Sequence, residues 1–133
     1  MIKLMLDANI LIYIIKHKPE SIIEHFMKYK PQQIGVSSIV YAEMMCGVYN
    51  SQQIERNLAA FHALVDNLIV IDFDNKAASL YAQHKARLKK AGQLISDNDL
   101  LIGCHALALG VPLISNNIRE YQRIDGLKLE NWV

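Results

Sequence analysis

The sequence predicts an α/β fold of three layers, α/β/α, in which helices cover both faces of a central, mainly parallel sheet of four or five strands. Short apolar runs alternate with helical patterns of ten or more residues along the chain. Connections of that length are typical of crossovers between parallel strands, because a hairpin needs only a few residues. With 133 residues, 52% of them hydrophobic, the chain is expected to form one domain spanning residues 1–133.

The individual elements are predicted from apolar periodicity and from the residues that start and stop helices. The expected strands are short apolar runs at 2–6, 34–36, 68–71, 111–115 and, at an edge of the sheet, 127–132. The expected helices cover 10–15, 20–30, 38–49, 52–66, 75–91 and 96–110. Asp74 and Ser96 are placed to cap two of these helices, and Gly110 to end the last one.

Composition excludes several classes of protein. The net charge is only +1, so nucleic-acid binding would depend on local basic clusters such as 16–18 and 85–90. Two cysteines without metal-ligand spacing do not make a disulfide framework, which favours a reducing, cytoplasmic location. Asp7 interrupts the apolar run at the start, which argues against a secretory signal. No run approaches the roughly 20 apolar residues of a membrane span, so no membrane partner is expected.

Polar residues directly follow three of the expected strands, at Asp7, at 37–38 and at 115–117. Functional residues of parallel α/β sheets gather beyond the carboxyl ends of the strands, so we expect these positions to lie together. For Asp7 a structural explanation stays open, because aspartate is a common cap of the helix that follows it.

Glu43 is the acid that a purely structural role explains least well. Apolar residues surround it at helical spacings of three and four, so its carboxylate is expected on the apolar face of the helix. Burying an unpaired carboxylate is costly unless a cation or hydrogen bonds compensate. We therefore favour a metal ligand over the alternative, a partly exposed glutamate paired with a lysine or arginine.

Asp99 lies three residues after Ser96, so it is either the acidic member of a capping box or a third ligand. Asp97 is explained by the helix dipole and is not expected to bind metal. Together Asp7, Glu43 and Asp99 offer the carboxylate oxygens that Mg²⁺ and Mn²⁺ prefer. Two such ions can stabilise the attacking and leaving oxygens of phosphodiester cleavage.

Three stretches that contain these acids resemble the PIN-domain ribonucleases, and specifically the VapC toxins of type II toxin–antitoxin systems. They read LMLDANILIYIIKHKPE, SSIVYAEMMCGV and GQLISDNDLLIGCHALALGVPLISNNIREYQRIDGLKLENW. In that family an Asp after the first strand, a Glu in the third-helix region and the Asp of NDLLI form the metal site, which correspond to Asp7, Glu43 and Asp99. The resemblance implies a PIN-like fold and cleavage of RNA by a metal-activated water, leaving a 5′-phosphate and a 3′-hydroxyl.

The chain departs from the family pattern at two places. Ala8 replaces the usual Thr or Ser, so a hydroxyl that could support the metal site is missing. Where many members carry a fourth acid, this chain has two asparagines, the second of them Asn117, with Glu120 three residues further on. Glu120 either completes the site through water or is an exposed carboxylate beside a neighbouring arginine. Asn9 either orients Asp7, contacts phosphate or has a structural role.

The resemblance also implies partners. The substrate would be a structured RNA such as tRNA, and a VapB-like antitoxin would block the acidic pocket with a basic residue. The family further implies a homodimer and contact with operator DNA only through the antitoxin.

Two other functions compete with this interpretation. One is a PIN-fold binding module that is catalytically weak or inactive, which Ala8 and the missing fourth acid would favour. The other is a small phosphatase, because Asp72 and Asp74 imitate the D-x-D motif of haloacid-dehalogenase-type enzymes. That motif normally follows the first strand of a longer chain, so we disfavour it. His105 is expected to pack in the core rather than to take part in catalysis.

Overall fold

Five parallel strands form the centre of the molecule, in the order β3-β2-β1-β4-β5. The computed structural model describes all residues, 1–133. The strands are β1 (Leu4–Leu6), β2 (Ile34–Ser37), β3 (Ile69–Ile71), β4 (Leu113–Ile114) and β5 (Leu129–Glu130). The expected sheet of four or five mainly parallel strands is confirmed, with five strands and no antiparallel pair.

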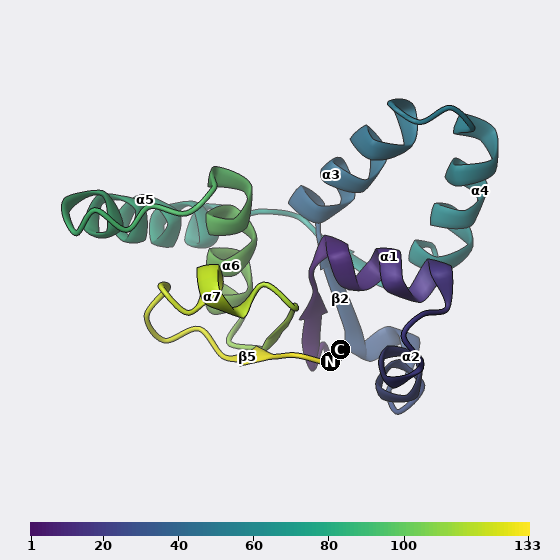
Figure 1. Ribbon diagram of the computed structural model, residues 1–133. Coiled ribbons are helices and arrows are strands. Elements are labelled where there is room, and N and C mark those ends of the chain that lie inside the picture. Colours follow the sequence, from purple (N-terminus) through teal and green to yellow (C-terminus); the bar gives the residue numbers. More distant parts are fainter.

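Helices connect every strand to the next. They are α1 (Ala8–Lys16), α2 (Glu20–Phe26), α3 (Ser38–Tyr49), α4 (Ile54–Val65), α5 (Asn75–Lys90), α6 (Asp97–Leu109) and α7 (Ile118–Tyr121), with a short 3₁₀ turn at Pro31–Gln33. Right-handed crossovers between parallel strands place α1 to α4 on one face of the sheet and α5 to α7 on the other, as Figure 1 shows. The predicted three-layer α/β/α arrangement is therefore confirmed.

The helix ends predicted from capping residues are found at the predicted positions. Asp74 caps α5 by accepting a hydrogen bond from the backbone N–H of Ala77, and Ser96 caps α6. Gly110 ends α6 in the left-handed conformation, with φ 70°.

Other boundaries differ from the prediction. The helix expected over 20–30 ends at Phe26, and Lys30, which precedes a proline, is extended. The strand expected over 111–115 forms only at Leu113–Ile114, because Pro112 has no N–H to donate to a neighbouring strand. The sequence patterns do not predict helix α7, which has only four residues.

The order of the strands reverses beside β1, because the chain leaves β1 toward β2 on one side and later returns to β4 on the other. Ligands of open parallel sheets bind at such a switch point, beyond the carboxyl ends of the strands. Every residue of β1 and β2 is buried, so the backbone that carries this edge is enclosed by the core. No helix in the structure is both long enough and apolar enough to cross a membrane.

His105 lies in the core, as expected, with only 1% of its surface exposed. Its Nδ1 lies 2.7 Å from the Ser37 hydroxyl, which also accepts a hydrogen bond from the backbone N–H of Ile39 and so caps α3. Burial lowers the pKa of His105, so the neutral ring accepts the Ser37 proton. This pair connects α6 to the first turn of the helix that carries Glu43.

Replacement of Ser37 should therefore destabilise the protein more than an ordinary surface serine would. Ser37→Ala removes the cap of α3 and leaves His105 Nδ1 buried without a partner, for a loss of about 2 kcal/mol in the free energy of unfolding. Urea denaturation followed by circular dichroism measures this loss. Ser79→Ala, on the exposed side of α5, is the control and should change stability by less than about 0.5 kcal/mol. Equal stabilities for both variants would contradict the role of Ser37.

Candidate metal centre

Asp7 lies at the switch point, directly after β1. Only 5% of its surface is exposed, and both of its carboxylate oxygens accept hydrogen bonds. Oδ1 accepts from the backbone N–H of Ala8 at 2.8 Å, and Oδ2 accepts from the hydroxyl of Ser115 at 2.8 Å. Asp7 is thus the N-cap of α1 and also a member of the acidic group at the edge of the sheet.

Glu43 projects from α3 toward the same edge. Its Oε1 is buried and has no hydrogen-bond partner. Its carboxylate forms no ion pair, so the alternative of a glutamate paired with a lysine or arginine is not what the structure contains. Only one other buried side-chain atom lacks a partner, Oδ1 of Asn9, which lies two residues after Asp7. Both atoms are acceptors, so what is missing at this edge is a donor or a cation.

Asp99 completes the acidic group from the first turn of α6. Its backbone N–H donates to Ser96 Oγ at 3.3 Å. Its carboxylate, in contrast, contacts residues of α7 and of the cap of that helix. Oδ2 accepts from Asn117 Nδ2 at 3.1 Å, and Oδ1 accepts from the Tyr121 hydroxyl at 3.2 Å. The carboxylate is therefore engaged by α7 instead of closing a capping box.

The three carboxylates interact electrostatically although they come from distant parts of the sequence. Burial raises the pKa of Asp7, and the charge of Asp99 adds to the rise, while hydrogen bonds from Ser115 and Ala8 oppose it. Burial also raises the pKa of Glu43, with further contributions from Asp7 and Asp99, while a hydrogen bond from Asn98 opposes the rise. No lysine or arginine compensates either group, so this edge holds concentrated negative charge.

The carboxylate oxygens of Asp7, Glu43 and Asp99 are of the kind that a hard divalent cation prefers, but they are spread apart. No three acidic, histidine or cysteine side chains converge as closely as the ligands of a closed metal cage. Mg²⁺ commonly binds through one or two carboxylates and keeps several of its waters, so an open arrangement of acids is compatible with it. The unpartnered oxygen of Glu43 is the observation that fits a missing cation best.

The remaining candidates divide into two groups. Asn117 contacts Asp99 directly, and the amide of Asn9 donates to Asn116 beside it, so both lie with the acids. Glu120 instead pairs with Arg123, with 3.7 Å between Oε2 and the guanidinium nitrogen.

Asp97 likewise faces away from the acids. Its Oδ1 lies 2.9 Å from Lys85 Nζ and accepts from the Tyr81 hydroxyl at 3.0 Å. These contacts lower the pKa of Asp97, so its neighbours, in addition to the helix dipole, account for its position.

No sequence pattern marks Tyr121 as a site residue, and Ser115 is marked only by its place after a strand. Tyr121 is fully buried, and burial raises the pKa of its phenol, so the hydroxyl keeps its proton and acts as a donor. A tyrosine four residues after Asn117 would have signalled this contact only if α7 had been predicted.

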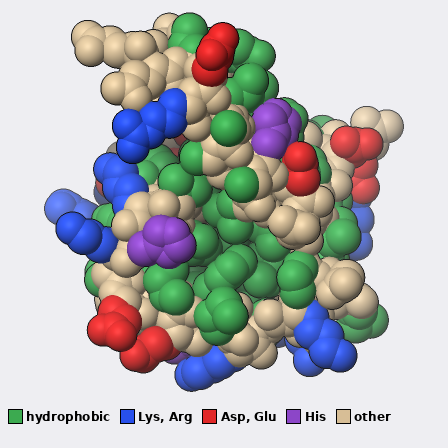
Figure 2. Space-filling view, turned by 90° about the vertical axis from the view of Figure 1, so that its right-hand side faces the viewer, with side chains coloured by type: hydrophobic (Ala, Val, Ile, Leu, Met, Phe, Trp, Pro, Cys, Tyr) green, Lys and Arg blue, Asp and Glu red, His purple; other side chains and the backbone are tan.

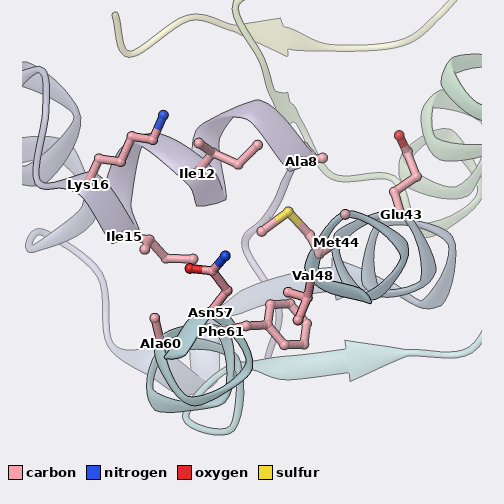
Figure 3. A pocket seen from close by; sticks show the side chains of 11 residues that line it. Ala8, Ile12, Ile15, Lys16, Glu43, Met44, Val48, Asn57, Ala60 and Phe61 are labelled. Atoms are coloured by element: carbon pink, nitrogen blue, oxygen red, sulfur yellow. The ribbon is translucent and has the colours of Figure 1, made fainter. Parts of the chain in front are cut away.

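An apolar groove of about 390 Å³ opens beside Glu43, between α1, α3 and α4. Figure 3 shows the aliphatic side chains of Ile12 and Met44 lining it, with Lys16 at one end and Glu43 at the other. Figure 2 shows the face of the molecule that carries α1, α2 and α4: hydrophobic side chains collect in its hollow centre, and lysines and arginines stand around the margin. Of the three acids, Glu43 is the one that lines this groove.

Comparisons with curated proteins agree with this arrangement. Ribonuclease VapC2 of Haemophilus influenzae is 41% identical over 133 residues, which cover all of both chains. The tRNA(fMet)-specific endonuclease VapC of Shigella flexneri is 38% identical over 132 residues and covers 99% of each chain.

Solved structures extend the likeness to the fold. DNA-bound VapBC from Salmonella typhimurium matches with a TM-score of 0.94 at 38% identity, and VapBC2 from Rickettsia felis bound to a promoter fragment matches with 0.91 at 38%. Each match covers 100% of this chain and 100% of the other. The family model of the PIN domain matches residues 4–127. The chain therefore belongs to the PIN-domain family.

Proposed function

We propose that this chain is the endoribonuclease toxin of a toxin–antitoxin pair and that it cleaves RNA in the cytoplasm with Mg²⁺ or Mn²⁺. The observation that carries the proposal is the buried, unpartnered Oε1 of Glu43, which lies within the field of Asp7 and Asp99 without a compensating cation. Two full-length relatives are named ribonuclease or endonuclease, which supports the reaction class.

Asp7, Glu43 and Asp99 are the residues that would hold the metal. When bound, a divalent ion supplies an activated water and neutralises phosphate charge. The hydrogen bonds of Ser115 to Asp7 and of Asn117 to Asp99 orient two of these carboxylates. The partner of Glu120 is Arg123, so we leave Glu120 outside the ligand set.

We further propose a structured RNA such as tRNA as the substrate class, with products that carry a 5′-phosphate and a 3′-hydroxyl. The Shigella relative is named for tRNA(fMet), which supports the class and not the particular RNA. Water attack on a phosphodiester needs no nucleophilic side chain.

The proposed partner is an antitoxin that occupies the groove between α1, α3 and α4 and places a basic residue against the acids. Toxin–antitoxin complexes, two of them with DNA, are among the similar solved structures. An apolar groove that ends at concentrated negative charge suits a segment with apolar side chains and one terminal cation. Homodimerisation and binding of operator DNA through the antitoxin complete the proposal.

The decisive test is cleavage of defined structured RNAs by the purified protein with Mn²⁺ or Mg²⁺ and with chelator. Asp99→Asn should lose activity by about 100-fold or more, because a ligand charge that stabilises the transition state is removed. Asp97→Asn is the matched control, since that acid lies two residues away and faces Lys85. Equal rates for wild type and Asp99→Asn would favour an inactive binding module instead.

Removal of the charge at position 43 should stabilise the protein without metal. The pKa of Glu43 is raised, so its ionised form disfavours folding above that pKa, and the penalty disappears as pH falls toward 4.5. Glu43→Gln should therefore raise Tm by a few degrees at pH 7 in chelator, less at pH 5, and should reduce the stabilisation that Mn²⁺ gives. Differential scanning calorimetry measures these shifts.

The control is Glu24→Gln, an exposed glutamate of α2. It should leave both Tm and the Mn²⁺ effect unchanged. A lower Tm for Glu43→Gln in chelator would contradict the account of Glu43 as an uncompensated charge.

The groove is tested separately from the acids. Ile12→Glu places a charge on the groove wall, where 40% of the isoleucine is exposed, so the substitution is compatible with the fold. It should weaken binding of the protein encoded by an adjacent upstream reading frame by about tenfold or more and leave RNA cleavage intact. Co-purification and calorimetry measure binding. Ile69→Glu, equally exposed on the edge strand β3, is the control.

A further inference from the structure

Tyr121, at the end of α7, contacts one of the proposed metal ligands, Asp99. Its side chain is fully buried at the end of α7, and its hydroxyl donates to Asp99 Oδ1 at 3.2 Å. One helical turn earlier, Asn117 Nδ2 donates to Asp99 Oδ2 at 3.1 Å. Two donors of one short helix therefore hold both oxygens of a single carboxylate.

The ring of Tyr121 reaches this place because α6 carries a glycine where the two helices meet. Gly103 lies one turn after Asp99, and a Cβ built there would be 3.2 Å from Cδ1 of Tyr121 and even closer to the side chain of Ile124. Any side chain at 103 would push α7 away from α6. The glycine thus allows the close approach that puts the hydroxyl beside Asp99.

The same hydroxyl also faces Asp7. It is one of the groups that lower the pKa of Asp7, so it lies between the two carboxylates at the switch point. Asp99 is half buried and its charge acts on Asp7 and Glu43, so the two donors of α7 are the contacts that hold the orientation of its carboxylate. Each carboxylate oxygen offers two lone pairs, and the hydrogen bonds from α7 leave one on each oxygen for a cation.

We propose that Tyr121 is a positioning residue of the metal centre, whose hydroxyl fixes the carboxylate of Asp99 in the orientation that binds the divalent ion. The inference rests on the metal site proposed above. Groups that orient metal ligands through hydrogen bonds commonly change metal affinity by 10- to 100-fold when they are removed. Packing alone does not explain the hydroxyl, because a phenylalanine would fill the same space.

The test is Tyr121→Phe, which removes the hydroxyl and keeps the ring. Calorimetric titration of the purified variant with MnCl₂ should give an affinity about tenfold weaker than that of wild type. In RNA cleavage kcat should fall by a similar factor while KM for the RNA stays unchanged. Asn117→Ala, which removes the other donor, should also weaken Mn²⁺ binding, and the double variant should bind more weakly than either. Tyr29→Phe, whose ring lies against Trp132, is the control and should match wild type.

The outcomes separate the two proposals. If wild type binds Mn²⁺ and Tyr121→Phe binds it equally well with the same kcat, the positioning role is wrong and the metal site stands. A lower Tm with unchanged Mn²⁺ affinity would likewise overturn the role, because the hydroxyl would then be structural only. If wild type binds no Mn²⁺, both proposals fail. Should Tyr121→Phe not fold, an unchanged affinity in Asn117→Ala would overturn the account of Asp99 held by α7.

Discussion

The mutual repulsion of three carboxylates is the constraint on which the rest of this structure depends. Asp7, Glu43 and Asp99 come from separate segments, and the reversal of strand order beside β1 brings them to one edge of the sheet. Asp7 and Asp99 accept hydrogen bonds on both oxygens, whereas Glu43 retains a buried oxygen without a partner. The fold therefore gives hydrogen-bond donors to both oxygens of Asp7 and Asp99, whereas a hydrogen bond from Asn98 is the only group that opposes the rise in the pKa of Glu43, and Oε1 stays without a partner.

Such an arrangement persists only on a rigid support. Strand β1 is buried throughout, and α3 is anchored at its first turn by Ser37 and His105 from the other face of the sheet. A hydrogen bond from the Phe73 backbone to Ser38 ties the same turn to the segment after β3. These contacts are remote from any substrate, yet they fix the direction in which Glu43 projects from its helix.

The fold could be predicted because helix caps and apolar periodicity are local features of the sequence. The site could be predicted only in part, because its contacts join residues that are distant in the sequence. Asp74, Ser96 and Gly110 mark helix ends through interactions with neighbours a few residues away. Tyr121 depends on Gly103, a contact between two helices that no periodicity reveals, and α7 is too short to leave a pattern. For the same reason the sequence left the supporting roles of Asn117 and Glu120 undecided, and the geometry pairs the latter with an arginine.

The carboxylate of Glu43 can be compensated by either of two ligands. The oxygen of Glu43 that lacks a partner lies where the acidic edge meets the apolar groove, so a cation from solution and a basic side chain from a bound protein would compensate the same field. Under the proposed function these two ligands exclude each other. An antitoxin would then inhibit by replacing the metal electrostatically, in addition to covering the substrate. Under the proposed function, the charge of Glu43 that burial disfavours is also the charge that attracts either ligand.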